Sequence, residues 1–208
     1  MPCQGDEFAR KMQHMGPSWV DNAMVSSDQS AAGLPYGCLA RRLTTHADAR
    51  GALAEVFRHQ WFDTPSPARW VSIQSQANVL RGVYLHSAAW TYLCLLGGRV
   101  FIGLHDMRPA AATAHQGFLV APDAMDRLAI AIPPGIAHGL YCPEGAMHLS
   151  ATSAADAAHA LLLCRWNCPE LKIDWPCTAP ILDPAEAAAD NYADFAARYG
   201  ARAAGPAA

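Results

Sequence analysis

A series of short apolar runs between Leu39 and Trp175 constrains the fold of this chain most strongly. Each run has the length of a β-strand, and glycine, proline or aspartate lies between most of them. Many short strands at this spacing are typical of a β-sandwich or barrel. We therefore expect one all-β domain over residues 37–178, with the double-sheet jelly roll as the natural candidate.

The two flanks of this region differ from it. Residues 1–36 show no sustained periodicity and end in a patch rich in Ser, Gly and Pro, which predicts an N-terminal extension or arm. Residues 179–208 are rich in alanine. Asp183 can cap a helix there, with Pro184 at its first position and Glu186 completing a capping box. We expect a C-terminal helix and tail, with Gly200 as the stop.

Composition excludes several partners. The 208 residues are 52% hydrophobic, which suits one domain with a substantial core, and the net charge of -3 offers no basic stripe for nucleic acid. No apolar run reaches the roughly 18 residues of a membrane span. The seven cysteines are an odd number without a C-x-x-C pair, and no secretory leader is recognisable. We expect a cytoplasmic protein with a small-molecule substrate, no nucleic acid and no membrane.

A histidine follows a tight turn in the segment "PPGIAHGL", residues 133–140. Proline and glycine shape the turn, and His138 can project from the next strand into a barrel mouth, as in small cupin jelly rolls. A metal cupin pairs this turn with an earlier H-x-H, but the corresponding place reads Tyr84-Leu85-His86. Two imidazoles make a poor first shell for a divalent metal. We therefore expect neither a metal nor another cofactor.

Five segments together resemble the dTDP-4-dehydrorhamnose 3,5-epimerase family. They are "DARGALAEVF" (48–57), "NVLRGVYLH" (78–86), "GRVFIGLHDMR" (98–108), "LAIAIPPGIAHGL" (128–140) and "WNCPELKIDWP" (166–176). The resemblance implies a cupin jelly roll (a double-stranded β-helix) that forms a homodimer. It also implies an activity: a histidine oriented by an aspartate removes a proton beside the C4 ketone of a nucleotide-linked sugar, a lysine holds the enolate charge, and a tyrosine returns a proton.

The residues that carry this reaction are all replaced in the present chain. Aligned on the motifs, the base is Tyr84, its aspartate is Cys168, the tyrosine falls at or near Ser150, and the lysine is Thr91. The substitutions lie on several strands yet converge on one site. Loss or replacement of the ancestral reaction explains them better than drift at one position.

Four further residues keep the family pattern. Arg50 and Glu55 lie in "RGALAE", Arg81 in the R-G pair, and His138 in the A-H-G turn. The resemblance implies that the two arginines contact a nucleotide diphosphate, which suits a forked guanidinium. Alternatively, the arginines brace the barrel by pairing with Glu55 or Asp48.

The altered pocket can still support chemistry. A phenol near pKa 10 is a weak base, so Tyr84 is better suited to act as an acid or hydrogen-bond donor. Strand alternation places His86 on the same face, where it or His138 can be the base. Cys168 is a candidate nucleophile, although a small buried core residue is the favoured interpretation. We expect His115, His148 and His159 at the surface or at strand edges.

Three functions remain open, and we lean towards an enzyme. The leading hypothesis is a metal-independent isomerase-like or cyclase-like reaction in a repurposed barrel, in secondary metabolism. Its candidate catalytic residues are Tyr84, His86 and His138. Its candidate substrate-binding residues are Arg50, Glu55, Arg81, Thr91, Ser150 and Cys168. The alternatives are a dTDP-4-keto-6-deoxy-sugar 3,5-, 3- or 5-epimerase with altered acid and base residues, and a non-catalytic binding or scaffolding homologue.

Overall fold

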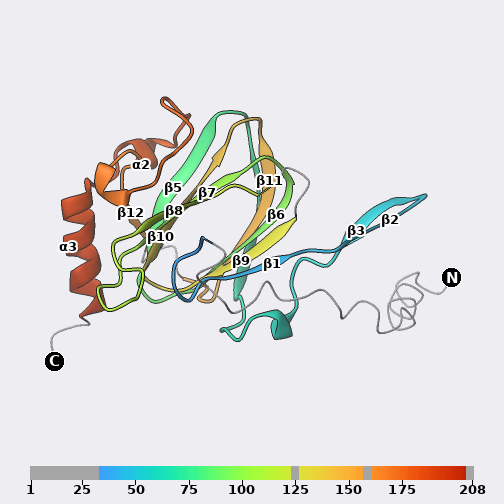
Figure 1. Ribbon diagram of the computed structural model, residues 1–208, viewed down its shortest axis with the longest axis horizontal. Coiled ribbons are helices and arrows are strands. Elements are labelled where there is room, and N and C mark those ends of the chain that lie inside the picture. Colours follow the sequence, from blue (N-terminus) through green and yellow to red (C-terminus); the bar gives the residue numbers. More distant parts are fainter. Residues whose placement is uncertain (1–32, 123–126, 157–160, 205–208) are drawn as a thin grey trace.

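Two five-stranded antiparallel sheets face each other in the computed structural model, which describes residues 33–122, 127–156 and 161–204 (Figure 1). Most of the expected extension, residues 1–36, lies outside this described part. The first sheet has the strand order β1-β9-β6-β11-β4 and the second β12-β5-β10-β7-β8. The predicted all-β jelly roll is therefore confirmed.

The first sheet contains β1 (Leu39–Arg42), β9 (Leu128–Ile132), β6 (Thr91–Gly98), β11 (Ala146–Thr152) and β4 (Arg69–Ser75). The second contains β12 (Leu161–Leu163), β5 (Val79–His86), β10 (Ile136–Cys142), β7 (Phe101–Asp106) and β8 (Gly117–Val120). A separate hairpin joins β2 (Thr45–Asp48) to β3 (Gly51–Ala54) and projects away from the sandwich (Figure 1). Two short 3₁₀ turns are η2 (His59–Trp61) and η4 (Pro169–Leu171).

Strand alternation divides the core into layers. Leu93, Ile102 and Ile130 belong to a buried cluster between the sheets, which includes residues of β6, β7, β9 and β10. Val83 and Leu85 belong to a second cluster on the outer face of the second sheet. Because β5 contributes its odd-numbered residues here to the outer layer, its even-numbered residues 84 and 86 face the interior.

The C-terminal region forms two helices where the sequence predicted one. Helix α2 (Pro184–Ala187) has the predicted capping box between Asp183 and Glu186. It then ends, and Asn191 caps α3 (Tyr192–Ala203) by accepting a hydrogen bond from the Asp194 amide at 3.0 Å. Gly200 does not stop the helix. Asparagine at the new N-cap explains the break, since it satisfies a backbone donor at a fresh helix start.

Helix α3 covers the outer face of the second sheet, where Phe195 and Tyr199 are buried with Val83 and Leu85 (Figure 1). In the described residues, no helix is long and apolar enough to span a membrane.

Candidate active site inside the barrel

Two histidines and a tyrosine from neighbouring strands meet between the sheets. Tyr84 of β5 is the register partner of His138 of β10, and their ring centroids lie 6.3 Å apart. His86, two residues further along β5, has its ring centroid 6.4 Å from that of His138. The structure thus brings together the three residues that the sequence proposed as catalytic.

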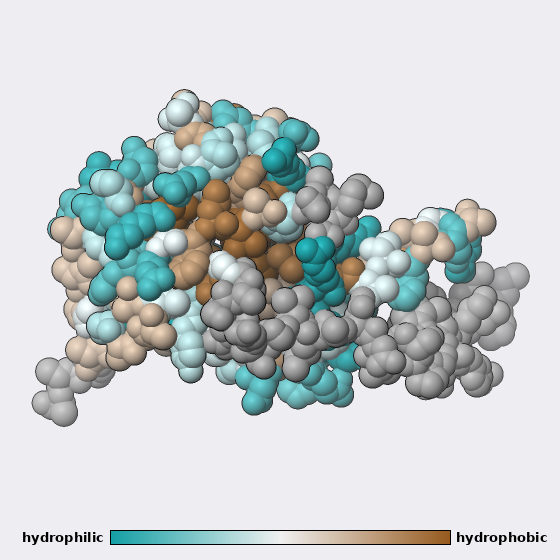
Figure 2. All heavy atoms as spheres, in the orientation of Figure 1, coloured by the Kyte–Doolittle hydropathy of each residue, from teal (hydrophilic) through white to brown (hydrophobic). Residues whose placement is uncertain are grey.

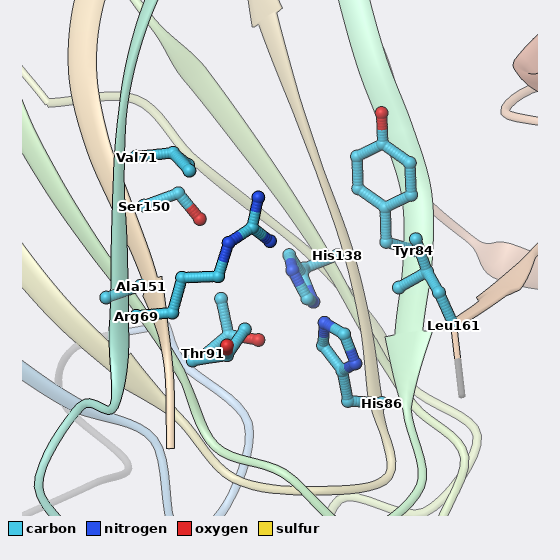
Figure 3. Close-up of a pocket in the computed structure, with 10 residues that line it drawn as sticks. Arg69, Val71, Tyr84, His86, Thr91, His138, Ser150, Ala151 and Leu161 are labelled. Atoms are coloured by element: carbon cyan, nitrogen blue, oxygen red, sulfur yellow. The ribbon is translucent and has the colours of Figure 1, made fainter. Parts of the chain in front are cut away.

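These rings line a cavity of about 170 Å³ (Figure 3). The first sheet contributes the opposite wall, which includes Thr91 and Ser150, two of the predicted substrate-binding positions. The remaining lining residues are Arg69, Val71, Ala151, Thr152 and Leu161. The cavity is smaller than the roughly 300–1,000 Å³ of pockets for drug-sized ligands, so only the reacting part of a larger substrate fits inside.

The surface between the two sheets is hydrophobic and has a hydrophilic border (Figure 2). On the face shown in Figure 2, hydrophobic side chains gather in a hollow between the two sheets, and hydrophilic side chains lie around it. A charged group inside such a hollow is poorly solvated, so its interactions are stronger than they are in water.

Burial keeps His138 neutral at physiological pH. His138 is 4% exposed, and loss of hydration, followed by the neighbouring His86, lowers its pKa from 6.5 to about 4. Its Nδ1 lies 3.3 Å from the Ile136 carbonyl oxygen. A neutral imidazole has one nitrogen with a lone pair, so His138 can accept a proton, and its lowered pKa makes it a weaker base than an exposed histidine.

Tyr84 is held by a carboxylate that the sequence did not point to as a site residue. Its hydroxyl donates a hydrogen bond to Oε1 of Glu186, which is 3% exposed. The same oxygen accepts from the Gly82 amide at 3.0 Å, and Oε2 accepts from the Asp183 amide at 2.8 Å. The capping-box pattern revealed Glu186 as a helix residue, but it gave no signal that α2 lies against β5.

The phenol is therefore poorly suited to be a base. Burial, and then the hydrogen bond to Glu186, raise the pKa of Tyr84 well above its ordinary value of 10. In Figure 3 its hydroxyl also points away from His86. Tyr84 stays protonated, and its proton is directed at Glu186.

Arg81 lies on β5 beyond the cavity lining. Its Nε donates to Oγ of Ser75 at 2.9 Å, and its register partner is Leu140. Burial, and then the nearby charge of Arg81, lower the pKa of His148 from 6.5 to about 4. His148 is only 1% exposed, so the expectation of a surface or strand-edge residue is wrong for it. Because β11 is a central strand with alternating burial, His148 points inward.

Arg50 and Glu55 are not brought to the cavity. Arg50 lies at the tip of the β2–β3 hairpin, where its side chain is 81% exposed and pairs with Asp48. Glu55 follows the hairpin and pairs with Arg58 at 2.6 Å. The alternative to ligand binding is that the arginines form ion pairs with Glu55 or Asp48. Arg50 does pair with Asp48, but on an exposed hairpin and not within the barrel.

Cys168 lies on the opposite side of the second sheet from the histidines. It lines an outer cavity of about 390 Å³ with Trp166 and Trp175. Trp175 packs so closely on the outer face that a Cβ at Gly103 would lie 2.5 Å from its ring. The structure therefore does not bring the residue aligned with the orienting aspartate to Tyr84, and the carboxylate that bonds to Tyr84 is that of Glu186.

Within residues 33–122, 127–156 and 161–204, no three His, Cys, Asp or Glu side chains are grouped closely enough to hold a metal ion. His159 lies outside the described residues. His115 adopts a left-handed backbone conformation in the loop between β7 and β8, with φ of 58°.

Comparison with known proteins places this geometry in a family. The family profile described as dTDP-4-dehydrorhamnose 3,5-epimerase matches residues 36–194. A Mycobacterium tuberculosis protein of that name is 30% identical over 74% of this chain and 82% of its own length. One from Neisseria gonorrhoeae is 29% identical over 70% of this chain, and the match spans only 47% of that relative.

Solved structures agree with the sequence comparison. The rmlC epimerase of Mycobacterium tuberculosis superimposes with a TM-score of 0.71 at 26% identity, covering 78% of this chain and 87% of the other. ChmJ, a 3'-monoepimerase from Streptomyces bikiniensis, shares the fold with a TM-score of 0.71 at 22% identity, over 80% of this chain and 88% of the other. The chain belongs to the dTDP-4-dehydrorhamnose 3,5-epimerase family.

Proposed function

We propose that this protein is an isomerase that removes and returns a proton on a carbon next to a ketone. The observation that carries the proposal is the pair of imidazoles, His86 and His138, on adjacent strands and facing one small cavity. Family membership makes a dTDP-linked 4-keto-6-deoxy sugar the first substrate to consider.

In this scheme an imidazole takes the proton. The ketone acidifies the neighbouring C–H bonds, and a neutral His138 or His86 accepts the proton while an enolate forms. Reprotonation on the other face inverts the carbon. Tyr84 is assigned to the wall of the site and not to proton removal, because its raised pKa and its bond to Glu186 keep its proton in place.

A second candidate is a ketone substrate without a nucleotide, handled by the same imidazoles in an isomerase-like or cyclase-like reaction of secondary metabolism. It is favoured by the lining itself, since Thr91 and Ser150 are uncharged and Arg50 lies away from the cavity. Apart from Arg69, the lining carries no permanently charged side chain, which suits a ketone substrate without a diphosphate.

We also propose a cytoplasmic homodimer. In support, the cysteines in the described part of the chain (Cys38, Cys94, Cys142, Cys164, Cys168 and Cys177) are all free thiols, as a reducing compartment requires. The β2–β3 hairpin projects from its own barrel and is largely exposed, which suits contact with a second copy.

The test is solvent exchange. The protein is incubated with a dTDP-linked 4-keto-6-deoxyhexose in D₂O, and deuterium at C3 and C5 is followed by NMR. We expect exchange in the wild type and its loss in the double variant His86→Gln/His138→Gln. If the wild type neither exchanges these protons nor binds dTDP in a calorimetric titration, the sugar assignment is wrong and the second candidate takes its place. A wild type that binds dTDP without exchange supports the non-catalytic homologue instead.

A further inference from the structure

The proposed reaction needs a group that stabilises negative charge. When the C–H bond breaks, its proton goes to the imidazole and its electron pair forms the C=C bond of the enolate. The carbonyl π pair then moves onto the ketone oxygen. A preorganised donor or cation at that oxygen is usually the largest contribution to such catalysis. Thr91 is uncharged, and burial keeps His138 neutral.

We propose that Arg69 is a catalytic residue, whose guanidinium binds the ketone oxygen and stabilises the enolate charge. This inference rests on the proposed proton transfer and names the residue that completes it. Sequence reasoning did not single out Arg69, because it lies in no motif of the chain.

The register of the first sheet brings Arg69 to the cavity. Arg69 is the first residue of β4 and pairs with Thr152 of β11, which in turn pairs with Thr91 of β6. The three residues therefore form one row across three adjacent strands, and all three line the cavity. With strands about 4.8 Å apart, the α-carbons of positions 69 and 91 are separated by roughly 10 Å, a gap that a long arginine side chain largely spans.

The side chain points into the site. In Figure 3 the Arg69 guanidinium extends from β4 into the space between Ser150 and His138. A planar guanidinium with several N–H donors suits an oxyanion there, close to the imidazole that takes the proton.

No acidic side chain among the described residues pairs with Arg69. The cavity lining contains no Lys, Asp or Glu, and Arg69 is its one arginine. Four other arginines are paired with acids, namely Arg50, Arg58, Arg108 and Arg198, and none of these four lines the cavity. An arginine left without an acidic partner inside a lined cavity retains its donors for a ligand.

The experiment compares Arg69→Gln and Arg69→Lys with the wild type. Arg69 is an exposed residue at the start of β4, so both variants are expected to fold. The readouts are kcat and KM for deuterium exchange in the dTDP-linked 4-keto-6-deoxyhexose, and the affinity for dTDP alone. We expect Arg69→Gln to lower kcat by about 10²-fold with little change in KM, a loss typical of one oxyanion donor. Arg69→Lys should recover part of kcat, since it restores the charge without the fork.

The outcomes separate this inference from the proposed function. Exchange in the wild type that Arg69→Gln leaves at the same kcat overturns the role of Arg69 while the isomerase assignment stands. A raised KM with unchanged kcat, or weakened dTDP binding, also overturns it, because Arg69 then binds a ground-state anion. If the wild type shows no exchange, the proposed function fails and this inference fails with it.

Discussion

The two faces of the second sheet carry the same strands but different chemistry. On the inner face, Tyr84, His86 and His138 line a cavity of about 170 Å³. On the outer face, Cys168 lines a cavity of about 390 Å³. The larger cavity is the one without histidines. The outer cavity is also lined by the titratable Cys168, Lys172 and Asp174, so the paired imidazoles, and not the volume, make the inner cavity the candidate site.

Glu186 belongs to the C-terminal helix α2 and accepts hydrogen bonds from the Gly82 amide and the Tyr84 hydroxyl of β5. The carboxylate that orients residue 84 therefore comes from the C-terminal segment, and not from the segment of Cys168 that aligns with the orienting aspartate.

Acid should destabilise the protein because it protonates histidines that are buried in their neutral form. Folding lowers the pKa of His138 and of His148 from 6.5 to about 4. Between these values the unfolded chain binds protons that the native state does not. Stability from these groups is thus fully present above about pH 6.5 and is lost as the pH falls to about 4, by about 3 kcal/mol for each histidine. Urea unfolding at a series of pH values measures this.

His148→Leu provides the control for the pH series. It removes one of the buried-histidine titrations, so the loss of stability between pH 6.5 and 4 should shrink by the contribution of His148, about 3 kcal/mol. An unchanged dependence would show that His148 is not buried in its neutral form.

Removal of Glu186 tests the link between the faces. Glu186→Ala leaves three donors, on Gly82, Tyr84 and Asp183, without their acceptor. We expect the free energy of unfolding to fall by about 3–5 kcal/mol. Tyr84→Phe removes only one of these bonds and should cost about 1–3 kcal/mol. Equal losses in the two variants would contradict the placement of Glu186.

A histidine at position 84 should take over the hydrogen bond that Tyr84 makes to Glu186. We expect Tyr84→His/Ser150→Tyr to raise the rate of exchange by at least about tenfold, since Glu186 can orient the new histidine. Adding Cys168→Asp should give no further gain because residue 168 lies on the outer face. NMR exchange rates of the double and triple variants decide this, and a gain that appears only with Cys168→Asp would reverse the assignment of the two faces.

Substitutions of Cys168 and Arg50, which lie away from the inner cavity, should have the smallest effects on exchange and on stability. Cys168→Ser is expected to change the exchange rate by less than about twofold, because residue 168 does not line the inner cavity. Arg50→Ala should leave the free energy of unfolding of the monomer unchanged within error, since its ion pair is exposed. Loss of dimer in the Arg50 variant, seen by sedimentation, would assign the hairpin to an interface.

Strand alternation made much of the inner site predictable from the sequence. The spacing of Tyr84 and His86 and the turn before His138 were sufficient to place three rings on one wall, because regular strands fix side-chain direction. The capping box at Asp183 was also predicted, and the structure contains it.

The contributions that depend on sheet order were not predictable. Arg69 reaches the cavity only because β4 pairs with β11, and Glu186 reaches Tyr84 only because α2 packs on β5. Neither relation leaves a local pattern. Cys168 shows the converse, since alignment with a motif did not determine the face of the sheet on which it lies.

The most direct measurement compares the double variant His86→Gln/His138→Gln with Cys168→Ser in the same deuterium-exchange assay, using one substrate and one pH. If the inner cavity is the reaction site, the double variant loses exchange by about 10²-fold or more while Cys168→Ser retains it. Full exchange in the double variant together with loss in Cys168→Ser would contradict the assignment of the chemistry to the inner face.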